Sequence, residues 1–200
     1  MKKILWLFLF ALLFSSVPAF SYDISKDLAI EIKQKEAAVK TSPSDPFVHF
    51  DLAMTYACSN KIVEGLDQLK KVQALNPNYA PIAVNIFKKK LAANPNDWQI
   101  RFRLAFAQYV ANQQKDSINN FQLILKQDPG NIWAMAYMGL AYGGLNQYDK
   151  AIVLFQQALK QYPGVSSIHY ALGEAYERKG DSWKGFQEKA EAMRLKMLGQ

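Results

Sequence analysis

Three side chains in this 200-residue sequence have the reactivity that nucleophilic catalysis or metal binding needs: His49, Cys58 and His169. Cys58 follows His49 by nine positions, about 13 Å along a helix, which is too far for a base to take the thiol proton. The histidines are distant from each other, and neither has a partner at metal-ligand spacing. We therefore predict no enzyme, no cofactor and no metal site. An enzyme using Cys58 is the remote alternative.

The charge pattern gives little support for nucleic-acid binding. The formal net charge is +7, which favours acidic partners or anionic surfaces in general terms. The densest basic run, Lys88–Lys90, lies in the last turns of a predicted helix, where lysines suit the negative end of the helix dipole. No nucleic-acid motif accompanies it. We predict other proteins or peptides as partners, and no nucleic acid.

The first residues have the pattern of an export signal. Two lysines precede an apolar run, Ile4–Phe14, and small residues then allow cleavage after Ala19 or Ser21. We therefore expect residues 1–21 to be a signal peptide and the protein to be periplasmic or secreted. The run is shorter than the roughly 20 residues that a membrane span needs. In the alternative, Ile4–Val17 stays uncleaved as an anchor, and only then is the membrane a partner.

The rest of the chain has the periodicity of helices. Residues 22–45 are predicted to form an N-terminal helix and a linker, after which Asp45 can cap a helix that starts at Pro46. Intervals of 34, 18, 34 and 34 residues separate five prolines, Pro43, Pro77, Pro95, Pro129 and Pro163. A period of about 34 residues, built from two helices and a turn, is the signature of the tetratricopeptide repeat.

The residues inside each period strengthen that resemblance. The third copy has the favoured residue types at Met138, Gly139, Tyr142, Ala151, Phe155, Ala158 and Pro163. The glycine pair Gly143–Gly144 is expected to separate its two helices. The resemblance implies an all-α, right-handed superhelical solenoid of antiparallel helix pairs. Its repeats would span about 46–79, 98–131, 132–165 and 166–199. The segment 80–95 would hold an extra unpaired helix, near 81–93. Lys189 in the last helix predicts a polar outer face that caps the stack.

In tetratricopeptide proteins the first helix of each repeat lines a concave groove that receives a peptide or a partner helix. Carried over position by position, the resemblance implies an aromatic groove made by Phe50, Phe102, Arg103, Phe106, Tyr109, Trp133, Tyr137 and Tyr170. Helical spacing alone does not separate such a groove from the core between repeats, so both interpretations stay open. If the groove is open, Phe106→Ala or Trp133→Ala weakens partner capture without unfolding the chain.

Taken together, these features predict a non-catalytic protein–protein interaction scaffold of the cell envelope. The alternative is a membrane-tethered assembly factor for an envelope complex, in which the N-terminal apolar run is retained. The mass of the exported chain distinguishes the two.

Overall fold

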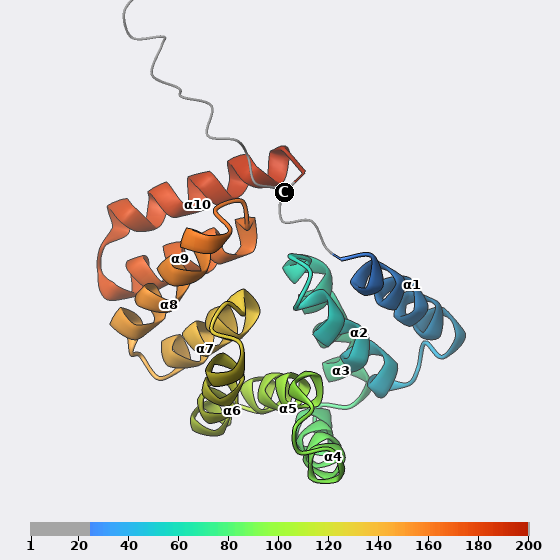
Figure 1. Ribbon diagram of the computed structural model, residues 1–200. Coiled ribbons are helices and arrows are strands. Elements are labelled where there is room, and N and C mark those ends of the chain that lie inside the picture. The colour runs from blue at the N-terminus through green and yellow to red at the C-terminus, as the bar shows by residue number, and fades with distance from the viewer. Residues whose placement is uncertain (1–24, 200) are drawn as a thin grey trace, which may run out of the picture.

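The computed structural model describes residues 25–199, which form ten α-helices and no strand. The helices are α1 (Lys26–Thr41), α2 (Pro46–Tyr56), α3 (Ile62–Leu75), α4 (Tyr79–Ala93), α5 (Trp98–Val110), α6 (Gln114–Gln127), α7 (Ile132–Gly144), α8 (Tyr148–Gln161), α9 (Ser166–Lys179) and α10 (Ser182–Met197). They follow one another round an arc, with α1–α4 on one limb and α7–α10 on the other (Figure 1). The all-helical solenoid of helix pairs is confirmed. The predicted signal peptide lies outside the described residues.

Polar side chains fix where several helices begin. The carboxylate of Asp45 accepts the backbone N–H of Phe47, and Pro46 occupies the first position of α2, where its missing N–H costs nothing. Asp97 and Asn131 also cap α5 and α7, each accepting an N–H from the third residue after it. These caps set the 34-residue register of the second and third repeats.

The turn inside each helix pair depends on one residue in the left-handed region. Asn60, Asn112 and Asn146 have φ of 58–59°, and Gly180 has φ of 100°. Asparagine and glycine are the residues that adopt this conformation at low cost. The glycine pair 143–144 is not the turn, because α7 runs to Gly144 and the chain reverses at Asn146.

α4 is the extra helix, and it begins at Tyr79 with Pro81 in its first turn. It has no second helix of its own. It packs mainly on α5, which forms a hairpin with α6. Ala83, Val84 and Phe87 are the buried side chains of α4 beyond its first residue. α4 therefore covers α5 as the second helix of a preceding repeat would.

The two limbs of the arc touch each other. The side-chain carbonyl of Asn60, in the turn between α2 and α3, accepts the backbone N–H of Ser167 at 3.2 Å. The amide of Asn60 donates to the hydroxyl of Ser166 at 3.5 Å. The first helix pair thus reaches across to the start of α9, and the concave side of the arc is partly closed by the chain itself.

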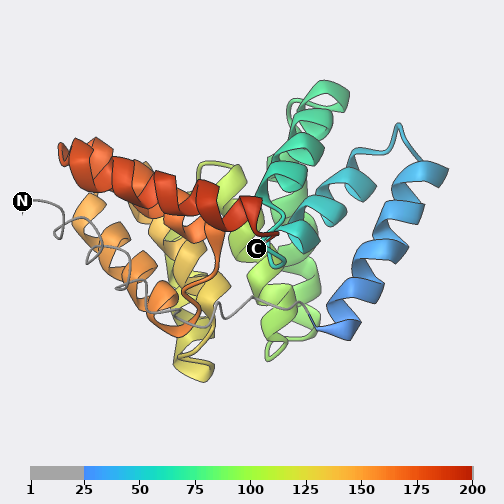
Figure 2. The same ribbon diagram turned by 90° about the horizontal axis from the view of Figure 1, so that it is seen from above.

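α10 lies at the free end of the stack, as Figures 1 and 2 show. The prediction of a polar outer face is wrong. Lys189 points to α9, where it pairs with Glu174 and, at 2.6 Å, with Glu177, because its position faces the hairpin partner. The side chains on the outer face of α10 are largely apolar. Within residues 25–199, no helix is both long enough and apolar enough to span a bilayer.

Candidate functional site

Five of the eight predicted groove residues form one aromatic cluster. The Tyr137 ring lies at its centre, with centroid distances of 5.2 Å to Phe106, 5.9 Å to Phe102 and 6.1 Å to Tyr109. Phe50 joins it through Phe106, at 6.0 Å. Apart from the half-buried Tyr109, these rings are at most 6% exposed.

The expectation of an open aromatic groove is therefore corrected at these positions. The rings belong to the main core cluster, and side chains of α2 and α3 line the same small pocket as Phe106 and Tyr137, so the core interpretation describes them. Partner binding through them stays a prediction. Tyr170 is separate, because it is 55% exposed on α9, with the Lys189 ammonium 5.4 Å from its ring centroid.

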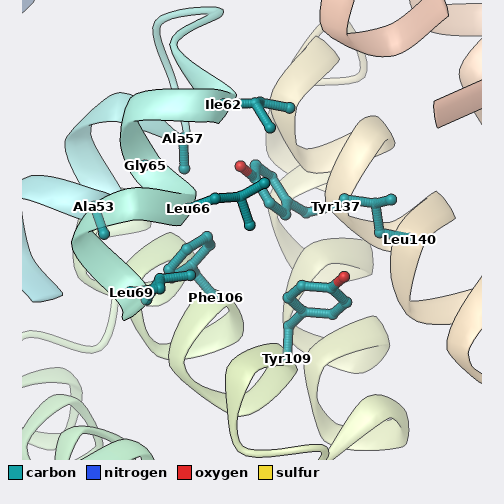
Figure 3. A pocket seen from close by; sticks show the side chains of 10 residues that line it. All are labelled: Ala53, Ala57, Ile62, Gly65, Leu66, Leu69, Phe106, Tyr109, Tyr137 and Leu140. Atoms are coloured by element: carbon teal, nitrogen blue, oxygen red, sulfur yellow. The ribbon is translucent and has the colours of Figure 1, made fainter. Parts of the chain in front are cut away.

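A small apolar pocket remains where the two limbs meet (Figure 3). Leu66 of α3 points across it toward Phe106 and Tyr137, and Leu140 of α7 lies on the far wall. Its volume is about 80 Å³. Ligand sites usually measure about 300–1,000 Å³. This pocket is therefore too small to hold a residue of a bound peptide, side chain and backbone together.

A larger cavity, here called the α1–α5 cavity, lies between α1 and α2 and the first turns of α5 and α7. Its volume is about 540 Å³. Aromatic rings from Trp98 and Trp133 share its wall with the guanidinium of Arg103 and the carboxylate of Glu31. Two of these, Arg103 and Trp133, are predicted site residues. The sequence interpretation missed Trp98, although a tryptophan directly after the helix cap Asp97 was a usable signal.

Four charged side chains fasten α1 beside this cavity. Arg103 binds Asp51 at 2.5 Å and Glu31 at 2.6 Å, and Lys35 lies 2.9 Å and 2.7 Å from the same two carboxylates. Burial would raise the pKa of Glu31, but the charges and hydrogen bonds of Lys35 and Arg103 outweigh it and hold that pKa below its usual value. Glu31 is therefore ionised at neutral pH, and the four side chains form one ion-pair network of alternating sign, of which Glu31 and Arg103 line the cavity.

Cys58 also lines the α1–α5 cavity, without the features of a nucleophile. Burial is the main cause that raises the pKa of its thiol to about 12. The reactive form of cysteine is the thiolate, so Cys58 is unreactive near neutral pH. In the described part of the chain, no group of three or more His, Cys, Asp or Glu side chains is placed to hold a metal ion. These findings disfavour an enzyme that uses Cys58.

The two histidines hold loops to helices. In each ring one nitrogen lies 2.9 Å from the carbonyl oxygen of a proline six residues earlier, and the other lies 2.7 Å from a side chain nineteen residues later. That later residue is Gln68 for His49 and Glu188 for His169. Both partners of His169 are acceptors, which suits an imidazolium with two N–H donors. Gln68 can present either an oxygen or an amide group to His49.

This difference predicts a pH effect at His169. Burial alone would lower its pKa, but the hydrogen bonds to Glu188 and the proline carbonyl, with the charges of Glu188 and Glu191, raise it above the ordinary 6.5. A raised folded-state pKa adds stability below pH 6.5, and this stability is lost as pH rises through the raised pKa. We expect the Tm to fall between about pH 6 and pH 8, and Glu188→Gln to remove most of that fall.

Thermal unfolding at several pH values measures this effect, and an NMR titration of His169 assigns it. The Gln68→Glu variant makes the reverse change in the first repeat, because it gives His49 a carboxylate partner like the one that His169 has. It is expected to add a second pH-dependent fall in Tm. A Glu188→Gln variant with the wild-type pH dependence would contradict the assignment.

Comparison with known proteins places this geometry in context. Residues 138–182 match the family model described as tetratricopeptide repeat. The fold is a tetratricopeptide-like solenoid. None of the curated proteins matches the sequence.

Solved structures similar to this solenoid carry the name MamA. One is described as "MamA 41-end from Desulfovibrio magneticus RS-1", with a TM-score of 0.56 and 20% identity over 86% of this chain and 87% of the other. The "MamA RS-1 ArsTM double mutant" has a TM-score of 0.57, with the same identity and coverage. "MamA MSR-1 C2" has a TM-score of 0.55 and 16% identity over 87% and 90%. At such identities the likeness is one of fold, and it covers most of the described arc.

Proposed function

We propose that this protein is a non-catalytic scaffold of the cell envelope that holds a peptide or helix of a partner protein in the α1–α5 cavity. The cavity carries the proposal. It is large enough for an apolar anchor side chain, and it opens where the first helices of two repeats begin. Tryptophan and arginine, which both contribute to its wall, are the residue types most often decisive in protein interfaces. The tetratricopeptide-like fold supports the proposal, because this family is expected to bind other proteins through its first helices.

A photoreactive benzoylphenylalanine at position 98 tests the cavity. Trp98 is 47% exposed at the cavity, so the replacement leaves the fold intact. We expect one partner to be cross-linked from this position, and purified Trp98→Ala to bind that partner at least about tenfold more weakly, as loss of an aromatic anchor predicts. Thermal unfolding of Trp98→Ala is expected to match the wild type.

Tyr162→Ala is the matched control, because Tyr162 is an exposed aromatic residue outside the cavity. It is expected to bind the partner as the wild type does. Equal affinity of Trp98→Ala and the wild type for the cross-linked protein would reject the cavity as the binding site.

The proposed location in the envelope rests on the sequence of residues 1–21. The second candidate function, a membrane-tethered assembly factor, is favoured by the apolar run Ile4–Val17 if that run is retained. Intact-mass measurement of the exported chain separates the two. A product that starts at Phe20 or Tyr22 supports the free scaffold, and a product that keeps the apolar run supports the tether.

A further inference from the structure

The outer face of α10 carries an uncovered apolar stripe. Trp183, Phe186, Met193 and Met197 are each more than 60% exposed, and Ala190 between them is exposed too. Steps of three, four, three and four residues place all five on one line along the helix, the spacing of a helix-packing seam. The rings of Trp183 and Phe186 stack at 5.9 Å. This stripe, here called the α10 seam, runs almost the whole length of the helix.

The α10 seam includes positions that the other repeats cover with a helix. One 34-residue period back, Phe186 corresponds to Ile152 of α8, and two periods back to Ile118 of α6. These isoleucines are 7% and 6% exposed. Met193 corresponds to Leu159, which is 9% exposed. α7 packs on α6 and α9 packs on α8, whereas the described chain has no helix after α10. The position of Phe186 is therefore covered in α8 and α6, the position of Met193 is covered in α8, and both are open in α10.

We propose that the α10 seam docks one amphipathic helix of a partner protein, in the place that the first helix of a fifth repeat would take. The stacking interface that joins α6 to α7 and α8 to α9 continues onto this face, so a helix is the element that fits it. With 16 residues, α10 is about 24 Å long, and a helix of about four turns covers the seam. Ala190 near its middle lets the incoming helix approach closely.

Charge selects the kind of partner helix. Beside the seam lie the exposed side chains of Lys196 and of Arg194, which is paired with Glu191 at 2.6 Å. α10 as a whole carries four cationic residues and two glutamates. A second copy of this chain would bring two such basic rims together, on molecules whose formal net charge of +7 falls only to +5 if Lys2 and Lys3 leave with the signal peptide. Like charges facing each other disfavour that pairing. The seam therefore fits a helix with glutamate or aspartate beside its apolar side chains.

A peptide with the sequence of α9, the helix that packs on α8, serves as the probe. A fluorescein-labelled, hydrocarbon-stapled peptide with the sequence of α9 has a surface that packs on a helix in the α10 position, and the staple avoids the cost of helix nucleation. A second peptide replaces Arg178 and Lys179 by glutamate. We expect both peptides to bind the purified protein at 1:1 stoichiometry, and the acidic peptide to bind about tenfold more tightly, with a strong dependence on salt.

The double variant Phe186→Gln/Met193→Gln is expected to weaken peptide binding at least about tenfold, because the seam loses its largest central contacts. Both side chains are exposed, so its Tm and circular dichroism are expected to match the wild type. Val153→Gln on α8 is the matched control, because it changes an exposed apolar residue outside the seam, and it is expected to leave binding unchanged.

Three results would overturn the proposal. The first is no binding of either peptide. The second is a dimer, seen by sedimentation, that the double variant abolishes, because that result assigns the seam to a second copy. The third is flotation with phosphatidylglycerol vesicles that depends on Phe186 and Met193, without peptide binding, because that result assigns the seam to a membrane surface. Trp98→Ala is expected to leave peptide binding unchanged, so failure at the cavity and failure at the seam are distinguishable.

Discussion

Replacing Phe106 by alanine is expected to lower the free energy of unfolding by about 3–5 kcal/mol, the usual cost of deleting a buried aromatic ring. Phe106 is 3% exposed, and its ring lies 5.2 Å from Tyr137 and 6.0 Å from Phe50. Because these rings come from α2, α5 and α7, the cavity left by Phe106→Ala loosens the contact between the limbs. Urea unfolding followed by circular dichroism measures the change.

Tyr170→Ala is the control for this prediction. It also removes an aromatic ring from the first helix of a repeat, but the Tyr170 ring is 55% exposed, so the change in unfolding free energy is expected to stay within about 0.5 kcal/mol. If Phe106→Ala were as stable as the wild type and only partner binding were lost, Phe106 would line an open groove after all.

Gly173→Val is expected to separate α10 from α9 and to destabilise the protein by about 1–3 kcal/mol, the usual cost of overpacking. A Cβ atom at Gly173 would lie 2.9 Å from the backbone carbonyl oxygen of Gly185 and 2.8 Å from Cγ of Lys189. A Cβ at Gly185 would likewise lie 3.0 Å from the carbonyl oxygen of Gly173. The two helices cross at these glycines, and a backbone carbonyl cannot move aside as a flexible side chain can.

Gly143→Val is the matched control, because no atom lies within 4 Å of a Cβ built at that helical position. It is expected to leave the Tm close to that of the wild type. For a chain of this size, about 1 kcal/mol changes the Tm by roughly 2–4 °C. Hydrogen exchange localises the effect: faster exchange confined to α9 and α10 supports the prediction, and unchanged exchange there contradicts it.

The helix pairs could be predicted from the sequence because their signals are local. The 34-residue proline spacing, the cap at Asp45 and the small residue at Gly139 each act within one repeat or between neighbours. The left-handed asparagines also belong to this local class. Asn60, Asn112 and Asn146 occupy the same place in three repeats. The sequence prediction nevertheless put the turn of the third repeat at glycines 143–144, because glycine is the commoner residue at the end of a helix.

The site was harder to predict because its geometry depends on distant contacts. Helical spacing places Phe102, Phe106 and Tyr137 on the faces that a groove would use. Whether those faces stay open depends on where α2 and α3 lie, and that is set by contacts such as Asn60 with Ser167. The α1–α5 cavity likewise needs the charge pairs between Glu31 and Arg103, which are 72 residues apart. No pattern within one repeat contains this information.

The contact between Asn60 and the start of α9 has a consequence for how the chain unfolds. In an open stack each repeat touches only its neighbours, so repeats fray from the ends in separate steps. Here residues more than a hundred positions apart are joined. The entropy cost of closing so long a loop grows only with the logarithm of its length, so a modest contact area suffices to hold the ends together. The first and last repeats of this protein are therefore expected to open as one cooperative unit.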